Sequence, residues 1–512
     1  MTGYRIFKIG DLNAFFGLLL DNLLNLVVLG GILIGGFGLP RDIVIGRMIP
    51  GTALGVLFGD LVYSYLAYRL ARNTKRDDIT AMPLGLDTPS TIGMAVMVIG
   101  PIYLETKDAL LTYKASMAVM LLIGVVKVIF SFLGDFIKRI LPTAALLGPI
   151  AGIGIALLGF FPLTKIFSNP IVGFTSMAII LVAFVAKYKI PYNIPAALLA
   201  VIVATLLYYL EGLTGVTPIK NIETSFGLAL PLPTLGFIDG MPVAIKYISI
   251  AIPFGLLTIV GGINVTESAR LAGDDYRTRD ILLTEAIATL IAGLFGGVAQ
   301  STPYIGHPAY KSMGASAGYT ILTALTIGIG SILGLTGVLV DIIPEAAVTP
   351  ILLFIGIEII KQAFVETPKK HIEAVIFSIM PIIGYLGLLN YDTITGALTG
   401  TKLPEGVVSE HNVLRAIGHG FILTSLIWGV ILTYIIDSNL KGLIITSIVA
   451  AVLTLFGLIH SITPEGSMYL PSSLEQNTHF LIASGYIIMM LIGIILIKYN
   501  RKDSVMDVLI EC

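Results

Sequence analysis

Long apolar runs separated by short polar stretches make up most of the chain. Runs of roughly 17–25 apolar residues are long enough to cross about 30 Å of hydrocarbon as a helix. About sixteen such segments follow one another, and two of them, 80–101 and 300–314, are too short or too polar to be simple helices. The pattern predicts an all-α polytopic membrane protein with two broken spans. The segments are expected near 14–37, 46–70, 80–101, 115–134, 142–161, 170–187, 192–210, 245–264, 281–298, 300–314, 317–340, 345–365, 371–389, 412–435, 442–461 and 479–498.

The basic residues give these spans an orientation, because Lys and Arg are enriched in the cytoplasmic loops of membrane proteins. We placed the N-terminus in the cytoplasm and counted both broken segments as crossings. Twenty of the 31 Lys and Arg then fall on the cytoplasmic side, nine on the other side and two inside segments. This bias predicts an even number of crossings, with both termini in the cytoplasm and the chain in the plasma membrane.

The composition excludes several other classes of protein. Hydrophobic residues make up 56% and charged residues 12% of the chain, whereas soluble domains carry about 25% charged residues. The net charge of −1 offers no electrostatic footprint for nucleic acid. A single cysteine, Cys512, and six histidines without ligand spacing predict no metal site. No glycine-rich nucleotide motif follows a predicted strand, so we expect no cofactor, no enzymatic activity and an ion gradient as the energy source.

Two short motifs recur along the chain and indicate an internal repeat. The sequence FGLL occurs at 16–19 and again at 254–257, and LFG occurs at 57–59 and again at 294–296. The two offsets, 238 and 237 residues, are nearly equal. Seven predicted crossings separate the two copies, and an odd number inverts the second copy in the membrane. Inverted repeats with broken helices near the midplane are typical of secondary transporters.

Each broken segment follows one LFG motif and contains a Thr-Pro step, within 83–89 in the first half and 300–308 in the second. Proline removes a backbone donor and pushes the preceding residue toward extended geometry. Each segment is therefore expected to begin as extended backbone and continue as helix. Free backbone groups and the positive end of the following helix can together hold a small planar or anionic solute.

The candidate solute-binding residues come from these segments and from the first and eighth spans. Asp87 can bind solute or cap the half-helix that follows it, and His307 can bind solute or act as a structural donor. Asn264 and Glu267 share one helical face, where Glu267 can bind a solute N–H and take up the coupling proton, or pair with Arg270 at the cytoplasmic interface. The full set is Asn25, Asp87, Thr88, Asn264, Glu267, Gln300, Ser301, Thr302, Tyr304 and His307.

Further ionisable residues inside predicted spans are weaker candidates, because such groups are costly in a bilayer and usually have a function. These are Asp60, Glu285 and Glu358. Lys127 in the fourth span can pair with one of the three acids, and the sequence does not say which.

Two stretches resemble the nucleobase/ascorbate transporters, the family of uracil, xanthine and hypoxanthine/guanine permeases. They are NVTESARLAGDDYRTRDILLTEAIATLIAGLFGGVAQSTPYIGHPAYKSMGA at 264–315 and AMPLGLDTP at 81–89. The resemblance covers most of residues 1–435. It implies two inverted seven-helix repeats, with solute held between short strands of the third and tenth segments and by an acidic residue of the eighth.

Carried over by position, the resemblance gives Glu267 or Asn264 the role in the eighth helix and puts Thr88 and Thr302 in the strands. The implied domains are a core at 1–134 and 241–340, a gate at 135–240 and 341–435, and an added transmembrane hairpin with a cytoplasmic tail at 436–512. This chain departs from the family motif in the tenth segment, because no carboxylate stands near Gly306. That departure puts both the nucleobase and the coupling ion in question.

Two functions follow from these patterns. The first is a proton- or sodium-coupled symporter of a nucleobase, such as the purines hypoxanthine, guanine or xanthine, in the lipid bilayer. The second is a transporter of a small anion such as sulfate or bicarbonate with the same fold. A carboxylate at Glu267 beside the site favours the nucleobase, because it repels an anion. A homodimer is left open.

Overall fold

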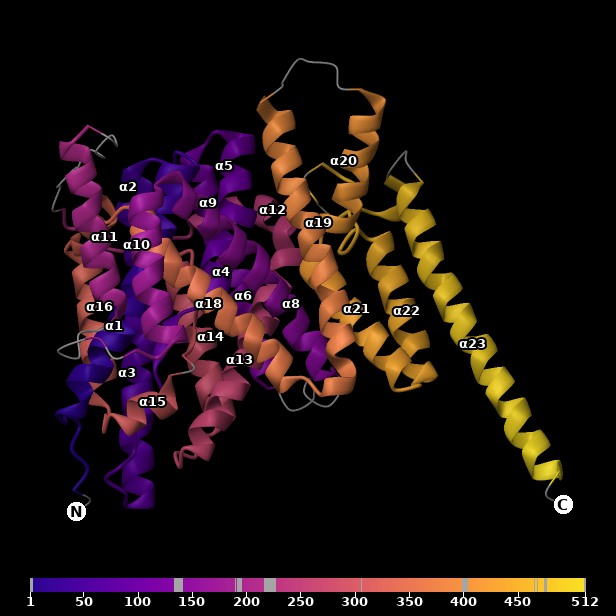
Figure 1. Cartoon of the computed structure of the whole chain (residues 1–512), viewed down its shortest axis with the longest axis horizontal. Helices are drawn as coiled ribbons and strands as arrows, with labels where there is room; N and C mark the ends of the chain where they lie inside the picture. The colour runs from indigo at the N-terminus through magenta and orange to yellow at the C-terminus, as the bar shows by residue number, and fades with distance from the viewer. Residues whose placement is uncertain are drawn as a thin grey trace. The chain divides into compact units, whose positions relative to one another are not determined.

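The computed structural model describes residues 3–510 except 133–140, 189, 191–195, 216–226, 305, 398–403, 465, 467 and 474–476. The chain forms two compact units (Figure 1). One unit contains residues 1–134 and 157–355, and the other contains 135–156 and 356–512. Each unit is described by itself below.

The first unit carries both broken segments. In its first half, α6 packs against α12, α13 and α14, while α3 packs against α14 and α16. Helices from the two halves of the sequence therefore interleave. Its elements are α1 (Gly10–Gly30), α2 (Arg41–Ile43), α3 (Ile49–Thr74), β1 (Leu84–Leu86), α4 (Thr88–Gly93), α5 (Gly100–Thr106), α6 (Ala109–Ser131), α9 (Phe161–Ser168), α10 (Pro170–Ile180), α11 (Ala196–Leu213), α12 (Gly236–Ala244), α13 (Ile248–Leu271), α14 (Thr278–Leu294), β2 (Ser301–Pro303), α15 (His307–Ser312), α16 (Gly318–Ile332) and α17 (Leu335–Ile342). Helix α18 (Glu345–Glu366) continues from this unit into the second.

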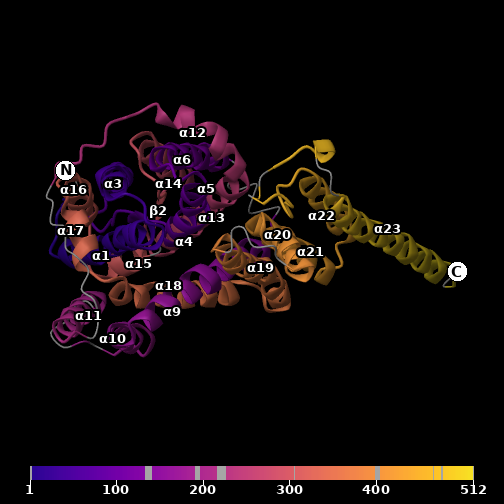
Figure 2. The same cartoon turned by 90° about the horizontal axis from the view of Figure 1, so that it is seen from above.

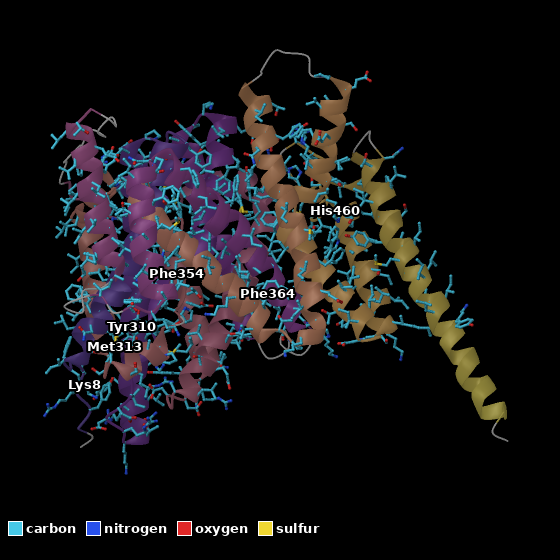
Figure 3. The ribbon with its side chains drawn as sticks, viewed as in Figure 1. Lys8, Tyr310, Met313, Phe354, Phe364 and His460 are labelled. Carbon is cyan, nitrogen blue, oxygen red and sulfur yellow. The ribbon has the colours of Figure 1, made fainter. Side chains whose placement is uncertain are left out.

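Helices are the only regular secondary structure among the described residues of the second unit. They are α8 (Thr143–Ile155), α19 (Ile372–Ala397), α20 (Glu405–Gly418), α21 (Phe421–Ile436), α22 (Leu440–Leu455) and α23 (Thr478–Ile510). Helices α22 and α23 form the predicted added hairpin, and α22 also packs on α21. Trp428 of α21 donates from Nε1 to the hydroxyl of Tyr486 in α23 at 2.7 Å, and the Nε2 atom of His460 lies 2.8 Å from the same hydroxyl (Figure 3). The hairpin is thus joined to its neighbour by polar contacts as well as by apolar packing.

Nine helices of the described part of the chain are long and apolar enough to cross a bilayer, or up to eleven if each of two bent helix pairs counts as one span. The bent pairs are α16 with α17, at 82°, and α20 with α21, at 66°. About sixteen crossings were expected. The difference lies in the two broken segments, the 17-residue α14 and the shorter apolar helices Pro170–Val185 and Leu440–Leu455. The chain is an all-helical multi-pass membrane protein with two short strands.

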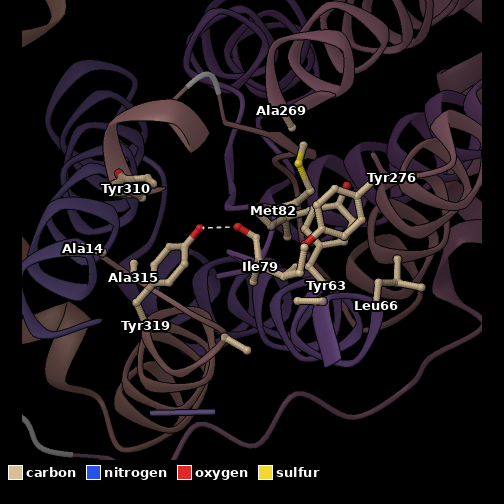
Figure 4. Packing of buried hydrophobic residues seen from close by; sticks show 14 of the residues in the cluster. Ala14, Tyr63, Leu66, Ile79, Met82, Ala269, Tyr276, Tyr310, Ala315 and Tyr319 are labelled. Atoms are coloured by element: carbon tan, nitrogen blue, oxygen red, sulfur yellow. Dashed lines mark hydrogen bonds between the residues drawn. The ribbon is translucent and has the colours of Figure 1, made fainter. Parts of the chain in front are cut away.

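A buried cluster of the first unit lies where α1, α3, α13, α15 and α16 meet the chain that leads into β1 (Figure 4). Three buried tyrosines donate hydrogen bonds to backbone carbonyls within it. Tyr319 donates to Ala81 at 2.7 Å, Tyr276 donates to Thr80 at 2.5 Å, and Tyr63 donates to Ile281 at 3.1 Å. The first two bonds fix the course of the chain just before β1, because buried carbonyls need partners.

Candidate functional site

The two broken segments meet as a pair of antiparallel strands. Leu84 pairs with Pro303, Gly85 with Thr302, and Leu86 with Ser301. The pairing extends beyond the strands, because the amide of Asp87 donates to the carbonyl of Gln300 at 3.0 Å and the amide of Tyr304 donates to that of Pro83 at 2.8 Å. Helices α4 and α15 follow the strands, and Figure 2 shows β2 among α1, α4 and α13. The predicted short strands in the third and tenth segments are confirmed.

Side chains from α1 and α3 satisfy the other edge of β1. The amide of Leu86 donates to Oδ1 of Asn22 at 3.1 Å, and Nδ2 of Asn22 lies 3.5 Å from the carbonyl of Leu84. The amide of Leu84 donates to Oδ1 of Asp60 at 3.0 Å. Both side chains are fully buried. Backbone groups inside a bilayer must find protein partners, so Asn22 and Asp60 are what permits extended backbone here.

A lysine from α6 satisfies the other edge of β2. Nζ of Lys127 donates to the carbonyl of Ser301 at 2.7 Å and to the hydroxyl of Thr289 at 3.2 Å. The carboxylate of Glu285 in α14 lies 3.7 Å from the same nitrogen, and both side chains are 0% exposed. The predicted acidic partner of Lys127 is therefore Glu285. The side chain of Glu358, another candidate, lies outside the described residues.

Asp87 caps the half-helix α4, which is the second of the two roles that the sequence suggested for it. Its Oδ2 atom accepts a hydrogen bond from the amide of Ser90 at 2.9 Å, and its carbonyl accepts one from Thr91 at 2.8 Å. Thr88, buried, begins the helix. A carboxylate at this position offsets the partial positive charge of the helix start. Helix α15 begins at His307 without a side-chain cap.

Gln300 holds β2 to α13. It is fully buried, its Nε2 atom donates to the carbonyl of Phe254 at 3.2 Å, and its Oε1 atom lies 3.4 Å from the hydroxyl of Thr258. The next residue differs, because the Ser301 hydroxyl is buried without a hydrogen-bond partner. Ser301 therefore keeps polar capacity inside the site, whereas Gln300 positions the strand.

Gly85 is the position of β1 that carries no side chain. A Cβ atom added there would lie 3.4 Å from Oδ2 of Asp21 and 3.8 Å from the ring of Tyr304. The Oδ2 atom of Asp21 is buried and has no hydrogen-bond partner. Thr302 is paired opposite Gly85. Asp21, Thr302 and Tyr304 thus surround the one strand position that carries no side chain.

Asn25, one of the predicted residues, bonds to the backbone of α1 near Asp21. Asn25 is buried and donates from Nδ2 to the carbonyl of Asp21 at 3.0 Å, one helical turn earlier. The FGLL repeat pointed to this part of α1, and the acid beside the predicted asparagine is the group that faces the strand.

Two predicted residues have a partner outside the two strands. His307 is buried, with Nε2 3.2 Å from a carboxylate oxygen of Asp274 and 3.2 Å from the carbonyl of Thr80. Glu267 forms an ion pair with Arg270, and its side chain is 43% exposed. Asn264 is half-buried on the same helix. The sequence analysis gave this pairing of Glu267 with Arg270 as the alternative to a role in binding solute.

The predicted set of solute-binding residues omits five polar residues of the strand crossing: Asn22, Asp21, Asp60, Lys127 and Glu285. Asp60, Glu285 and Lys127 stood among the weaker candidates because they are ionisable groups inside apolar spans. Asn22 carries no charge, so hydropathy alone does not single it out. Its distance from the FGLL motif is the one signal that marks it.

Comparison with known proteins identifies the fold. No family model matches the chain. No curated protein matches its sequence. The transmembrane domain of the cyanobacterial bicarbonate transporter BicA matches in structure with a TM-score of 0.51 at 16% sequence identity, covering 82% of this chain and 97% of that one. Murine Slc26a9, an anion transporter solved in the inward-facing state, matches with a TM-score of 0.51 at 14% identity, covering 79% of this chain and 70% of that one.

The chain therefore has the inverted-repeat fold of these two membrane domains, which belong to transporters rather than enzymes. Its resemblance to the nucleobase/ascorbate transporters holds at the level of this shared fold. At such low identity a fold does not specify the solute, because unrelated functions recur on one fold. The solute has to be argued from the site itself.

Proposed function

We propose that the chain is a secondary active transporter that moves a small solute across the membrane by alternating access. The supporting observation is the buried crossing of β1 and β2, where two broken membrane segments meet at Gly85 and Thr302. Discontinuous segments at the junction of two repeats are where secondary transporters bind solute. In this proposal, residues 1–134 and 241–340 move as a core against a gate formed by 135–240 and 341–435, and both termini are cytoplasmic.

A small oxyanion such as bicarbonate or sulfate is the favoured solute. The two structural matches are a bicarbonate transporter and an anion transporter. The site offers hydroxyl donors at Ser301 and Thr302 and a buried ammonium group at Lys127. The sequence-based objection to an anion was a carboxylate at Glu267, and that carboxylate is half-exposed and paired with Arg270.

A nucleobase is the second candidate, supported by one observation. The unpartnered Oδ2 atom of Asp21 and the ring of Tyr304 both lie beside Gly85. A carboxylate oxygen accepts N–H donors, and an aromatic ring stacks on a planar heterocycle. That combination suits hypoxanthine or xanthine better than an anion.

Counterflow in proteoliposomes separates the two solutes. Vesicles that contain the purified protein and unlabelled bicarbonate, sulfate or hypoxanthine are diluted into buffer with the same solute in radiolabelled form. Protein-dependent exchange of bicarbonate or sulfate without hypoxanthine is the expected result. Exchange of hypoxanthine alone would establish the second candidate, and exchange of none of the three by folded protein would contradict both.

A further inference from the structure

Lys127 and Glu285 form a buried pair that joins the binding strand to two membrane helices. Nζ of Lys127 is surrounded by three oxygen groups, the carbonyl of Ser301 at 2.7 Å, the hydroxyl of Thr289 at 3.2 Å and the carboxylate of Glu285 at 3.7 Å. Two of these groups lie on α14 and one lies on β2. Any change in the charge of the pair therefore acts directly on the strand proposed to bind solute.

Glu285 differs from the other buried acids near the strands in how it is held. Asp60 accepts the amide of Leu84, and Asp87 accepts the amide of Ser90. Accepted hydrogen bonds favour the charged form of a carboxylate, so protonation of either acid would weaken a backbone contact. Among the described residues no backbone amide donates to Glu285, whose carboxylate has the side chains of Lys127 and Thr302 beside it. Protonation of Glu285 leaves the backbone hydrogen bonds of both strands in place.

Asp21 is the remaining rival, because its Oδ2 atom is also without a partner. It faces Gly85, where solute would meet it in the proposed function. In the described part of the chain the charged group that acts on it is another acid, Asp87, and not a lysine or arginine. Glu285 has a fixed cation beside it and lies behind the strand. The position of Glu285 suits a coupling ion that binds at the same time as solute. An ion bound at Asp21 would instead compete with solute for the same position.

We propose that Glu285, paired with Lys127, is the site that binds the coupling proton. In the empty transporter the pair consists of a carboxylate and an ammonium group, with no net charge. One proton from water on the open side adds to a Glu285 oxygen and gives a carboxylic acid beside the unchanged ammonium group, with a net charge of +1. Release of that proton to water on the other side restores the pair. No other bond forms or breaks.

This assignment rests on the proposed function and explains how proton and anion would be coupled. An anion near Ser301 and Thr302 is repelled by ionised Glu285 and attracted by Lys127. Protonation of Glu285 removes the repulsion and leaves the attraction, so each ligand increases the affinity for the other. A monovalent anion bound together with one proton adds no net charge to the buried site, which lowers the cost of moving the site through a low-dielectric region.

The other titratable groups near the pair come from two elements. Asp87, at the start of α4, interacts with both Lys127 and Glu285. Tyr63 of α3 interacts with Glu285, and Asp60 lies on the same helix. Asp87 retains its hydrogen bond to Ser90, and the hydroxyl of Tyr63 donates to Ile281. Both groups already have a structural partner, so Glu285 is the group expected to change its protonation.

Two assays on the full chain in proteoliposomes test this assignment. Counterflow of bicarbonate, sulfate and hypoxanthine reports transport itself, and accumulation under an imposed pH gradient, with internal pyranine as the proton probe, reports coupling. Wild-type protein is expected to acidify the vesicle interior as labelled solute accumulates. In Glu285→Gln, normalised to its own counterflow, the ratio of accumulation with the gradient to accumulation without it should fall to about one, because the amide cannot take up the proton. Glu373→Gln is the matched control, because Glu373 is an exposed carboxylate in α19.

The outcomes separate the coupling site from the transport function. Counterflow in wild type with proton-driven accumulation retained in Glu285→Gln would overturn the assignment and leave the transporter proposal intact. Absence of counterflow in wild type would overturn the proposed function. If Glu285→Gln does not fold or exchange solute, Glu285→Asp provides the test, since it keeps a titratable group at a greater distance from Lys127. The pH of half-maximal accumulation should then shift, and an unshifted midpoint would overturn the assignment.

Discussion

The amide of Leu84 donates a 3.0 Å hydrogen bond to Oδ1 of Asp60, a residue on a different element 24 positions earlier in the chain. This bond supplies a partner for a strand amide that β2 does not reach. Neither group is exposed. The strand β1, which is proposed to bind solute, is therefore held in place by a side chain that need not touch solute.

Removal of this acceptor is expected to destabilise the protein. Asp60→Leu leaves the Leu84 amide buried without a partner, which costs about 1–3 kcal/mol. Asp60→Asn keeps an oxygen that can accept the hydrogen bond from Leu84. Its loss of stability should therefore be clearly smaller than that of Asp60→Leu. The measurement is the thermal unfolding midpoint of each variant in detergent. Equal midpoints for the two variants would mean that the hydrogen bond contributes little.

Gly85 is expected to be essential for transport. Gly85→Val adds side-chain atoms where a Cβ already lies 3.4 Å from Asp21 and 3.8 Å from Tyr304. Crowding of about 1.4 kcal/mol at the site corresponds to a tenfold loss in solute affinity. Counterflow at low solute concentration measures it. Gly46→Val is the control, because no atom lies within 4 Å of a Cβ placed there, and equal activity of the two variants would remove Gly85 from the site.

Glu267→Gln tests whether Glu267 takes part in transport, as the family resemblance implies, or only forms an ion pair with Arg270. The ion pair with Arg270 is half-exposed, and such pairs contribute about 0–1 kcal/mol. We expect accumulation of solute close to the wild-type level. Loss of accumulation in a folded Glu267→Gln variant would instead support the eighth-helix role that the resemblance implies.

Acid stability offers a test outside the membrane-spanning segments. Hydrogen bonds from the Arg76 guanidinium lower the pKa of Asp78 from 3.8 to about 2. The charged pair therefore stabilises the folded state above about pH 4, and this contribution is lost as the pH falls through about 2. Asp78 is 57% exposed, so the effect should be a few tenths of a kcal/mol. Asp78→Asn should lose less stability than wild type between pH 5 and pH 2, and parallel losses would contradict this.

The sequence was sufficient to predict the strands because their cause is local. Proline residues at 83, 89, 303 and 308 disrupt helical hydrogen bonding wherever they stand. The inverted repeat was visible for a similar reason, since two motifs recur at one offset. The count of full-length spans was less predictable, because apolar composition does not tell a straight helix from a bent pair such as α16 and α17.

The partners within the site depend on packing between distant segments. Lys127 reaches Glu285 because α6 lies against α14, and no sequence spacing encodes that contact. Glu267 was singled out as an acidic residue of the eighth span that shares a helical face with Asn264, but its side chain pairs with Arg270 and is 43% exposed. His307 contacts Asp274, a residue of the α13–α14 connection whose position is set by the fold of the whole unit.

The pairing of β1 with β2 has a consequence for biosynthesis. Leu84 pairs with Pro303, so β1 leaves the ribosome 219 residues before its partner. At about 5–20 residues per second, the first half waits roughly 10–45 s with one edge of β1 lacking its final backbone partners. Unpaired backbone is costly inside hydrocarbon. The nascent first half must therefore be sheltered at the insertion machinery, or keep this segment at the membrane surface, until the tenth segment is synthesised.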